Sequence, residues 1–298
     1  MAKKDESFFS VVGYRNKTMY ILIENATFDE AYQMIEKRGS QFENINIIEE
    51  KRVESTPKNL LVVANAEGML NETKELLDRP VKLKETFLFL GNYIAPGKGF
   101  YDYMNYLIQL RKKRKCLFVK GKNEYNLLEY IHGTKDYIGE KKDVLALIDA
   151  IESELSFNLT TLPTRFPDIY NILSESSNFF ENDAYIFVYG GLDLSLDYWK
   201  QTPVKEMFQT TIDFLSDINE TEKKIVFGNI PVTILRKSGT LRPWINGMQD
   251  KFGINGDCQN GGKLYGMSIL DGDYSFISIR SKNTKKSQPS DLSYDYIT

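Results

Sequence analysis

Short polar segments follow several apolar stretches of this chain, and their side chains are the ones that could do chemistry. Five segments contain glycine and end such stretches: residues 64–68, 91–97, 121–124, 189–191 and 228–231. Their polar side chains include amides, carboxylates, an ammonium group and a phenol, among them Asn65, Glu67, Asn92, Lys122, Asn123, Tyr189 and Asn229. Amide and carboxylate oxygens are the ligands that Mg²⁺ and Ca²⁺ prefer, so a weak cation site is conceivable. The ammonium group of Lys122 opposes it, because a cation repels a dication in a partly buried place.

Histidine is nearly absent, and this limits the chemistry further. The chain contains one histidine, His132, in the segment EYIHGTKDY. A site built on several imidazoles is therefore excluded, and Ser-His-Asp catalysis would depend on His132 alone. The residue follows a predicted helix, where a solvated or helix-capping histidine is the favoured interpretation.

The elements that position the polar segments alternate between strands and helices. NLLVVAN, KETFLFLGN, CLFVKG, AYIFVYGG and KKIVFGN are short apolar runs typical of buried strands, and helical spacing occurs between them. This alternation predicts an α/β layered fold. In such sheets, chemistry gathers at the carboxyl ends of the strands, where the polar segments lie.

The first part of the chain has a different pattern. Residues 8–23 alternate apolar and polar positions in two runs, Thr27 and Glu30 form a capping-box pattern, and residues 42–53 alternate again. These features predict a small ββαβ unit over residues 1–57. The main domain is expected over residues 58–280, and residues 281–298 are expected to form a polar C-terminal tail.

The polar segments resemble, in order and spacing, the motifs of the calcineurin-like metallophosphoesterases. The resemblance is to the bacterial and phage serine/threonine-phosphatase and diadenosine-tetraphosphatase branch, which carries D-x-H-G, G-D-x-x-D-R-G, G-N-H-E, H-A-G or H-G-G, and G-H-T-P. FLFLGNYIAPG, CLFVKGKNEYNLL, IFVYGGLD, Gln201-Thr202 and GGKL at residues 261–264 are similar to the family as well. The resemblance extends from about Leu60 to Leu270. It implies a layered metallophosphoesterase-like β-sandwich flanked by helices.

The same resemblance implies that the metal ligands are replaced. That family holds two divalent metals, which activate a bridging water. In the first two motifs, Asn65 and Glu67 occupy the positions of the family's first Asp and His, Asn92 occupies that of the bridging Asp, and Ala95-Pro96 occupies that of the phosphate-orienting D-R. In the third motif, Lys122 occupies the position of the metal-binding Asn and Asn123 that of the catalytic His. Tyr189 and Asn229 occupy the positions of the two later His residues. A substrate-binding Arg is also missing from residues 205–218. The loop-shaping positions are retained: Gly68, Gly91, Gly97, Gly121, Glu124, Gly190, Gly191, Gly228 and Pro231. We therefore expect no catalytic residue, no metal and no cofactor, and a degenerate pocket lined by the seven polar side chains named first.

Two interpretations of Lys122 remain open. Its ammonium group could occupy the position of the missing cation and pair with Glu67. Alternatively, both side chains simply point to water.

Composition bounds the environment and the partners. Apolar residues make up 42% and charged residues 27% of 298 residues, with a net charge of -3, so a nucleic-acid binder is not expected. The basic run at residues 111–115 is interpreted as a solvated helix end. Cys116 and Cys258 are far apart, and neither a signal segment nor a membrane span is evident, so a cytoplasmic protein is expected.

The expected function is that of a pseudophosphatase that binds a protein partner. Its Lys-, Asn- and Ile-rich texture suggests a phage or prophage protein that engages a host factor, and self-association into a homo-oligomer is a further expectation. Two alternatives remain: a divergent phosphoesterase with a weak or rearranged metal site, and a module that binds a phosphorylated ligand or nucleotide.

Overall fold

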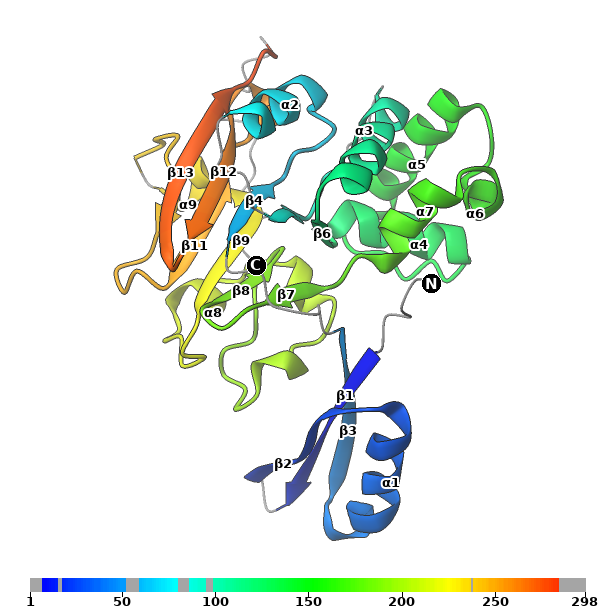
Figure 1. Cartoon of the computed structure of the whole chain (residues 1–298), viewed down its shortest axis with the longest axis vertical. Helices are drawn as coiled ribbons and strands as arrows, with labels where there is room; N and C mark the ends of the chain where they lie inside the picture. Colours follow the sequence, from blue (N-terminus) through cyan, green and yellow to red (C-terminus); the bar gives the residue numbers. More distant parts are fainter. Residues whose placement is uncertain are drawn as a thin grey trace. The chain divides into compact units, whose positions relative to one another are not determined.

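The chain forms two compact units. The computed structural model describes residues 7–15, 18–51, 59–79, 86–94, 99–236 and 238–283 (Figure 1). One unit comprises Met1–Thr56 with Ser195–Thr202, and the other Pro57–Leu194 with Pro203–Thr298. The expected junction near residue 57, Ala95-Pro96 with Gly97, and the chain beyond residue 283 lie outside the described residues. Among the helices that are described, none is long and apolar enough to cross a membrane.

The first unit contains the predicted ββαβ order. Its antiparallel sheet has the order β2-β1-β3, and one helix connects β2 to β3 along the chain. The bounds are β1 Ser7–Arg15, β2 Thr18–Ala26, α1 Phe28–Arg38 and β3 Asn44–Lys51. The capping box forms: the Thr27 hydroxyl accepts the backbone N–H of Glu30, and the Glu30 carboxylate accepts that of Thr27 at 2.8 Å. Val11 and Ala31 pack together as its small core.

The second unit contains two five-stranded sheets. The first has the order β13-β12-β4-β5-β6, with β4, β5 and β6 parallel and β12 and β13 antiparallel to their neighbours. The second has the order β10-β11-β9-β8-β7, with β8, β9 and β11 parallel. The bounds are β4 Leu60–Ala64, β5 Thr86–Leu90, β6 Cys116–Val119, β7 Phe179–Glu181, β8 Tyr185–Val188, β9 Lys224–Pro231, β10 Trp244–Ile245, β11 Lys251–Asn255, β12 Lys263–Leu270 and β13 Asp273–Arg280. The continuous apolar runs of β4, β5 and β8 are buried along their whole length, as strands covered on both faces require.

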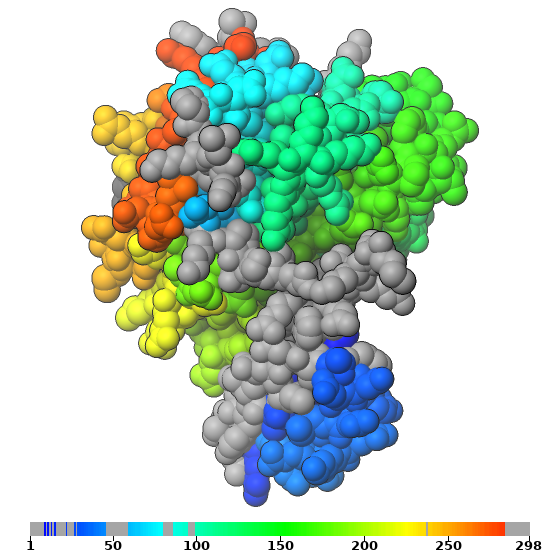
Figure 2. Space-filling view, in the orientation of Figure 1, coloured from blue at the N-terminus to red at the C-terminus, as the bar shows by residue number. Residues whose placement is uncertain are grey.

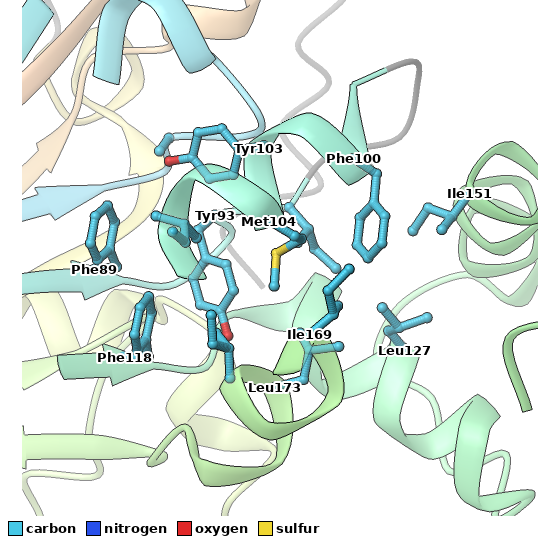
Figure 3. Packing of buried hydrophobic residues seen from close by; sticks show 14 of the residues in the cluster. Phe89, Tyr93, Phe100, Tyr103, Met104, Phe118, Leu127, Ile151, Ile169 and Leu173 are labelled. Carbon is cyan, nitrogen blue, oxygen red and sulfur yellow. The ribbon is translucent and has the colours of Figure 1, made fainter. Parts of the chain in front are cut away.

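Helices cover the first sheet and form a layer beside its β6 edge (Figure 1). Their bounds are α2 Leu70–Asp78, α3 Phe100–Lys113, α4 Lys122–His132, α5 Lys141–Leu155, α6 Leu162–Arg165 and α7 Pro167–Glu175, with the short α8 Ile212–Ser216 and α9 Val232–Leu235 in the second half. Figure 3 shows the core between strands and helices, where the rings of Phe89 and Phe118 stack at 5.2 Å and face Tyr93. Phe100 and Tyr103 of α3 also belong to this core.

A glycine allows the two sheets to approach each other closely. Gly228 in β9 faces Ala64 in β4, and a Cβ atom on Gly228 would lie 2.6 Å from the Ala64 Cβ and 3.4 Å from the Leu90 carbonyl oxygen. Ala64 and Leu90 pair with each other at the ends of β4 and β5, so neither can move without disturbing the sheet. The contact between the sheets therefore depends on the missing side chain of Gly228.

We predict that Gly228→Ala lowers the free energy of unfolding by about 1–3 kcal/mol, because the added methyl group overpacks the sheet contact. Gly247→Ala is the matched control, since a Cβ atom there meets no atom within 4 Å. Urea unfolding followed by circular dichroism measures both. Equal stability of the two variants would contradict the assigned role of Gly228.

Candidate functional site

The parallel strands of each sheet bring the predicted polar side chains to their carboxyl ends. Asn65 and Glu67 follow β4, Asn92 follows β5, Lys122 and Asn123 begin α4 after β6, and Tyr189 follows β8. Asn229 differs from the expectation, because it lies inside β9. That strand continues to Pro231, which pairs with Asn255 of β11 beyond a register shift.

The loops after β4 and β5 are joined by a short ladder of backbone hydrogen bonds. The N–H of Glu67 donates to the Asn92 carbonyl at 2.8 Å, and the N–H of Gly68 donates to the Tyr93 carbonyl at 2.9 Å. Asn65, Glu67 and Asn92 adopt left-handed backbone angles, with φ of 47°, 45° and 41°. Non-glycine residues in this region are strained, and such strain persists only where the surroundings fix it. The two loops are therefore held in one defined conformation.

Glu124 fixes the loops after β5 and β6. Its side chain is fully buried. Its carboxylate accepts three backbone N–H groups, from Asn92 at 2.9 Å, Ile94 at 2.9 Å and Gly121 at 2.8 Å. Burial raises the pKa of Glu124 to about 7, and the backbone donors oppose the rise. Glu124 is thus a structural carboxylate, as the resemblance implied.

Asn92 directs its side chain into the same loop network. Its amide oxygen accepts the backbone N–H of Asn123 at 3.0 Å, and the Asn123 side chain donates to the Ile94 carbonyl at 3.0 Å. Asn92 is only 6% exposed. These two amides therefore tie the β5 loop to the first turn of α4.

Tyr189 packs against the glycine that precedes Asn92. A Cβ atom on Gly91 would lie 2.1 Å from the Tyr189 ring and 3.0 Å from the Gly121 Cα, so the ring rests directly on the loop backbone. Tyr189 is buried together with Phe208 and Ile138, and Tyr125 packs beside them. Three aromatic rings and one isoleucine thus form an apolar cluster beside the end of β8.

Asn229 belongs to a separate set of contacts on the second sheet. Its amide donates to the Thr210 hydroxyl at 3.4 Å, and that hydroxyl donates to the Gly190 carbonyl at 2.8 Å. Its own carbonyl accepts the side-chain amide of Asn255 at 3.1 Å. Asn229 therefore links the ends of β8, β9 and β11.

Lys122 lies beside the loop between α4 and α5. Its Nζ would be 3.6 Å from a Cβ atom on Gly139, while its charge is near enough to lower the pKa of Glu67. Within the described ranges, however, no ion pair shorter than 4.0 Å joins Lys122 to Glu67. The direct pairing considered from the sequence is absent, because the ammonium group extends toward Gly139.

Glu67 has a second acidic neighbour that the sequence analysis did not identify. The pKa of Glu67 is raised to about 8, first by burial of its carboxyl group and then by Asp257 and Glu124. Burial also raises the pKa of Asp257, whose carboxylate accepts the Asn260 amide at 2.7 Å. Asp257 follows β11, which is parallel to β9. The polar sequence Asn255-Gly256-Asp257 at the end of this strand was the signal that could have placed Asp257 among the strand-end residues.

Asn65 completes this acidic group. Its side-chain amide lies 3.4 Å from a Glu67 carboxylate oxygen, and Asn65 is only 5% exposed. Its Oδ1 atom is buried without a hydrogen-bond partner among the described residues. The group thus combines an unsatisfied acceptor with two carboxyl groups whose negative charge is disfavoured.

Two other sequence features have structural roles. His132 ends α4, and its Nε2 lies 3.0 Å from the Tyr170 hydroxyl on the surface, which confirms the helix-end interpretation. The basic run ends α3, where Arg111 pairs with Glu175 and Lys112 with Asp168 at exposed positions.

The residues present do not fit a two-metal centre. The Asn92 oxygen is engaged by Asn123, Tyr189 packs as a ring on Gly91, and Asn229 donates to Thr210. Across the described part of the chain, no group of three or more His, Cys, Asp or Glu side chains could hold a metal ion. We therefore derive no catalytic step through a metal.

Several solved structures are similar to this chain. A provisionally assigned diadenosine tetraphosphatase is 15% identical, with a TM-score of 0.56 over 78% of this chain and 97% of that one. A cold-active protein tyrosine phosphatase is 11% identical, with a TM-score of 0.49 over 77% and 86%. A serine/threonine phosphatase from Saccharomyces cerevisiae is 13% identical, with a TM-score of 0.49 over 77% and 82%. No family model and no curated protein matches the sequence.

These findings define the class of fold. Two mixed sheets flanked by helices, with the first of these similarities, show that the chain has the calcineurin-like metallophosphoesterase fold. The fold implied by the sequence resemblance is confirmed. The identities are low, so the comparison establishes architecture and leaves activity to the residues of the site.

We predict that Glu124→Gln lowers the free energy of unfolding by roughly 1–3 kcal/mol, because a glutamine amide cannot accept all three backbone N–H groups. Chemical denaturation near pH 7 measures the change. Glu220→Gln, at an exposed position, is the control and should change stability by less than about 0.5 kcal/mol. A loss no larger than that of the control would show that Glu124 does not brace the loops.

We predict that Glu67 makes the protein less stable as the pH rises. Its ordinary pKa is 4.5 and its folded pKa is about 8, so between these values the unfolded chain releases a proton that the folded chain retains. Stability linked to Glu67 is therefore present below pH 4.5 and lost as the pH rises through about 8. Glu67→Gln should remove this part of the decline. The free energy of unfolding should therefore fall between pH 4.5 and pH 8 by roughly 1–3 kcal/mol less in the variant than in the native chain.

Unfolding curves at a series of pH values test this expectation. Glu220→Gln again serves as the control, because Glu220 is exposed and lies in a different part of the sequence. Parallel profiles for the native chain and Glu67→Gln would show that Glu67 titrates at an ordinary pKa.

Proposed function

We propose that this protein is a pseudophosphatase that acts by binding a protein partner, without hydrolysing phosphate esters. It would bind the partner through the strand-end site, which comprises Asn65, Glu67, Asn92, Lys122, Asn123, Tyr189 and Asp257. The main support for this proposal is that the side chains of Asn92 and Tyr189 are engaged in contacts within the chain. The Asn92 oxygen accepts the Asn123 N–H, and the Tyr189 ring covers Gly91. Metal-dependent phosphoester hydrolysis depends on charge stabilisation at this place, and neither side chain supplies it.

The loop scaffold supports a binding role. Glu124 holds two loops by three backbone hydrogen bonds, and the ladder between Glu67 and Asn92 joins the third. Loops fixed in this way lose little conformational freedom when a partner binds, which favours association. Lys122 and Asn123 are partly exposed at the start of α4 and supply polar groups for recognition.

A protein partner is favoured over a nucleic acid by the charge of the chain. The net charge is -3, whereas nucleic-acid binders usually carry a basic excess that attracts the phosphate backbone. Origin in a phage or prophage remains part of this proposal and rests on the composition of the sequence alone.

We predict that the protein has no metal-dependent hydrolase activity. Purified protein incubated with Mn²⁺ and an aryl phosphate or a dinucleoside polyphosphate should release no product above the background without protein. Metal analysis after dialysis should find no bound divalent metal. Turnover that requires Mn²⁺ and is lost in Glu67→Ala, but kept in the exposed control Glu220→Ala, would establish a divergent phosphoesterase instead.

Partner binding is tested on the same scaffold. We expect Lys122→Glu to abolish or strongly reduce capture of the protein that the native chain binds. Lys113→Glu, which reverses an exposed charge at the end of α3, should leave this capture unchanged. Equal capture by both variants would place the binding surface elsewhere.

A further inference from the structure

The β13 strand forms one edge of the first sheet of the second unit. It spans eight residues, Asp273–Arg280, and pairs with β12 over its whole length in unbroken antiparallel register. No strand within the described ranges pairs with its other side. Figure 2 shows its side chains, in orange-red, at the surface of this unit. The strand therefore presents a row of backbone groups that a further strand could pair with.

The other sheet edges of this unit are much shorter. β6 has four residues, β7 has three and β10 has two. Short edges, prolines, bulges and lysines are the usual means by which proteins prevent edge-to-edge association. β13 contains no proline, lysine or bulge, and its only charges are Asp273 and Arg280 at its two ends.

Packing on both faces keeps β13 in a pairing-ready conformation. On one face Ile279 is buried in the helix-covered core and Ile277 packs against it. On the other, the Tyr274 ring contacts Phe252 of β11 at 4.9 Å and Phe276 at 5.6 Å. A strand fixed in this way loses little freedom when it gains a neighbour, so pairing would have a low entropic cost.

We propose that β13 is a dimerisation edge at which two copies of this chain pair antiparallel, joining their first sheets into one continuous sheet. A two-fold axis perpendicular to the sheet places residues on the same face opposite each other. With the axis at Ile277, this residue meets its own counterpart. Tyr274 meets Arg280 of the partner subunit, and Phe276 meets Ser278 of the partner subunit.

This register is self-complementary. It sets an apolar pair at the centre and an aromatic ring beside a guanidinium group on either side, and both kinds of cross-strand pair are favourable. The exposed Arg280 thus acquires a neighbour in the second copy. An unrelated extended peptide could use the same edge, but the two-fold pairing of Ile277 with itself and of Tyr274 with Arg280 favours a second copy as the occupant.

The molar mass of the purified full chain in solution is the first test. Light scattering over a range of concentrations should show a mass rising from 34.4 kDa toward twice that value. Hydrogen exchange should show the alternate β13 amides that do not face β12 becoming protected as the dimer forms. A monomer at every concentration, or unchanged exchange of those amides, would overturn the proposal.

Two lysine variants separate this edge from other interfaces. Ser275 is exposed, and Ser275→Lys places an ammonium group opposite Ile279 of the partner subunit, so dimerisation should weaken about tenfold or more. Ser153→Lys makes the same change on the exposed face of α5 and should leave the dimer intact. Circular dichroism checks that both variants are folded. If Ser275→Lys unfolds, the exchange experiment on the native chain decides alone. A dimer that persists in folded Ser275→Lys uses another surface and overturns the proposal.

Discussion

The strand-end site depends on one buried carboxylate. Glu124 accepts backbone N–H groups from Asn92, Ile94 and Gly121, and its environment excludes water. Without this carboxylate, three buried backbone N–H groups in two loops would lack a hydrogen-bond acceptor, and each unsatisfied donor costs free energy. Glu154 acts in a comparable way at the start of α3, where it accepts the N–H groups of Gly99, Phe100 and Tyr101. Carboxylates thus fix the loops that surround the site.

This bracing explains how the loops keep their shape with amide side chains at the strand ends. The backbone ladder between the β4 and β5 loops and the contact between Asn92 and Asn123 supply cohesion from within the chain. Tyr189 adds apolar packing on Gly91, a position where a side chain would collide with the ring. The site is therefore stabilised by hydrogen bonds and packing within the chain.

Buried carboxyl groups whose negative charge is disfavoured dominate the electrostatics of the site. Glu67 and Asp257 both have raised pKa values, chiefly because their carboxyl groups are buried, and Lys122 opposes the effect on Glu67 without forming an ion pair with it. The buried Asn65 oxygen, which has no hydrogen-bond partner among the described residues, adds an unsatisfied acceptor. An unsatisfied buried acceptor costs free energy.

The sequence by itself determined the elements and most of the positions at the strand ends. The apolar runs and the Thr27 capping box are local signals, and they correctly predicted the ββαβ unit and the α/β layers. The structural role of Glu124 was implied by the family resemblance, and its burial is seen only in the structure. The tertiary structure alone decided which side chains meet. Asp257 lies near Glu67, although nearly two hundred residues separate the two acids, because Asp257 bridges to Lys263 at the start of β12, the strand that pairs with β4. Lys122 turns to Gly139, and Tyr189 covers Gly91, because rotamers and contacts between distant loops depend on packing. Sequence spacing encodes local periodicity, whereas these distances arise only when the sheets assemble.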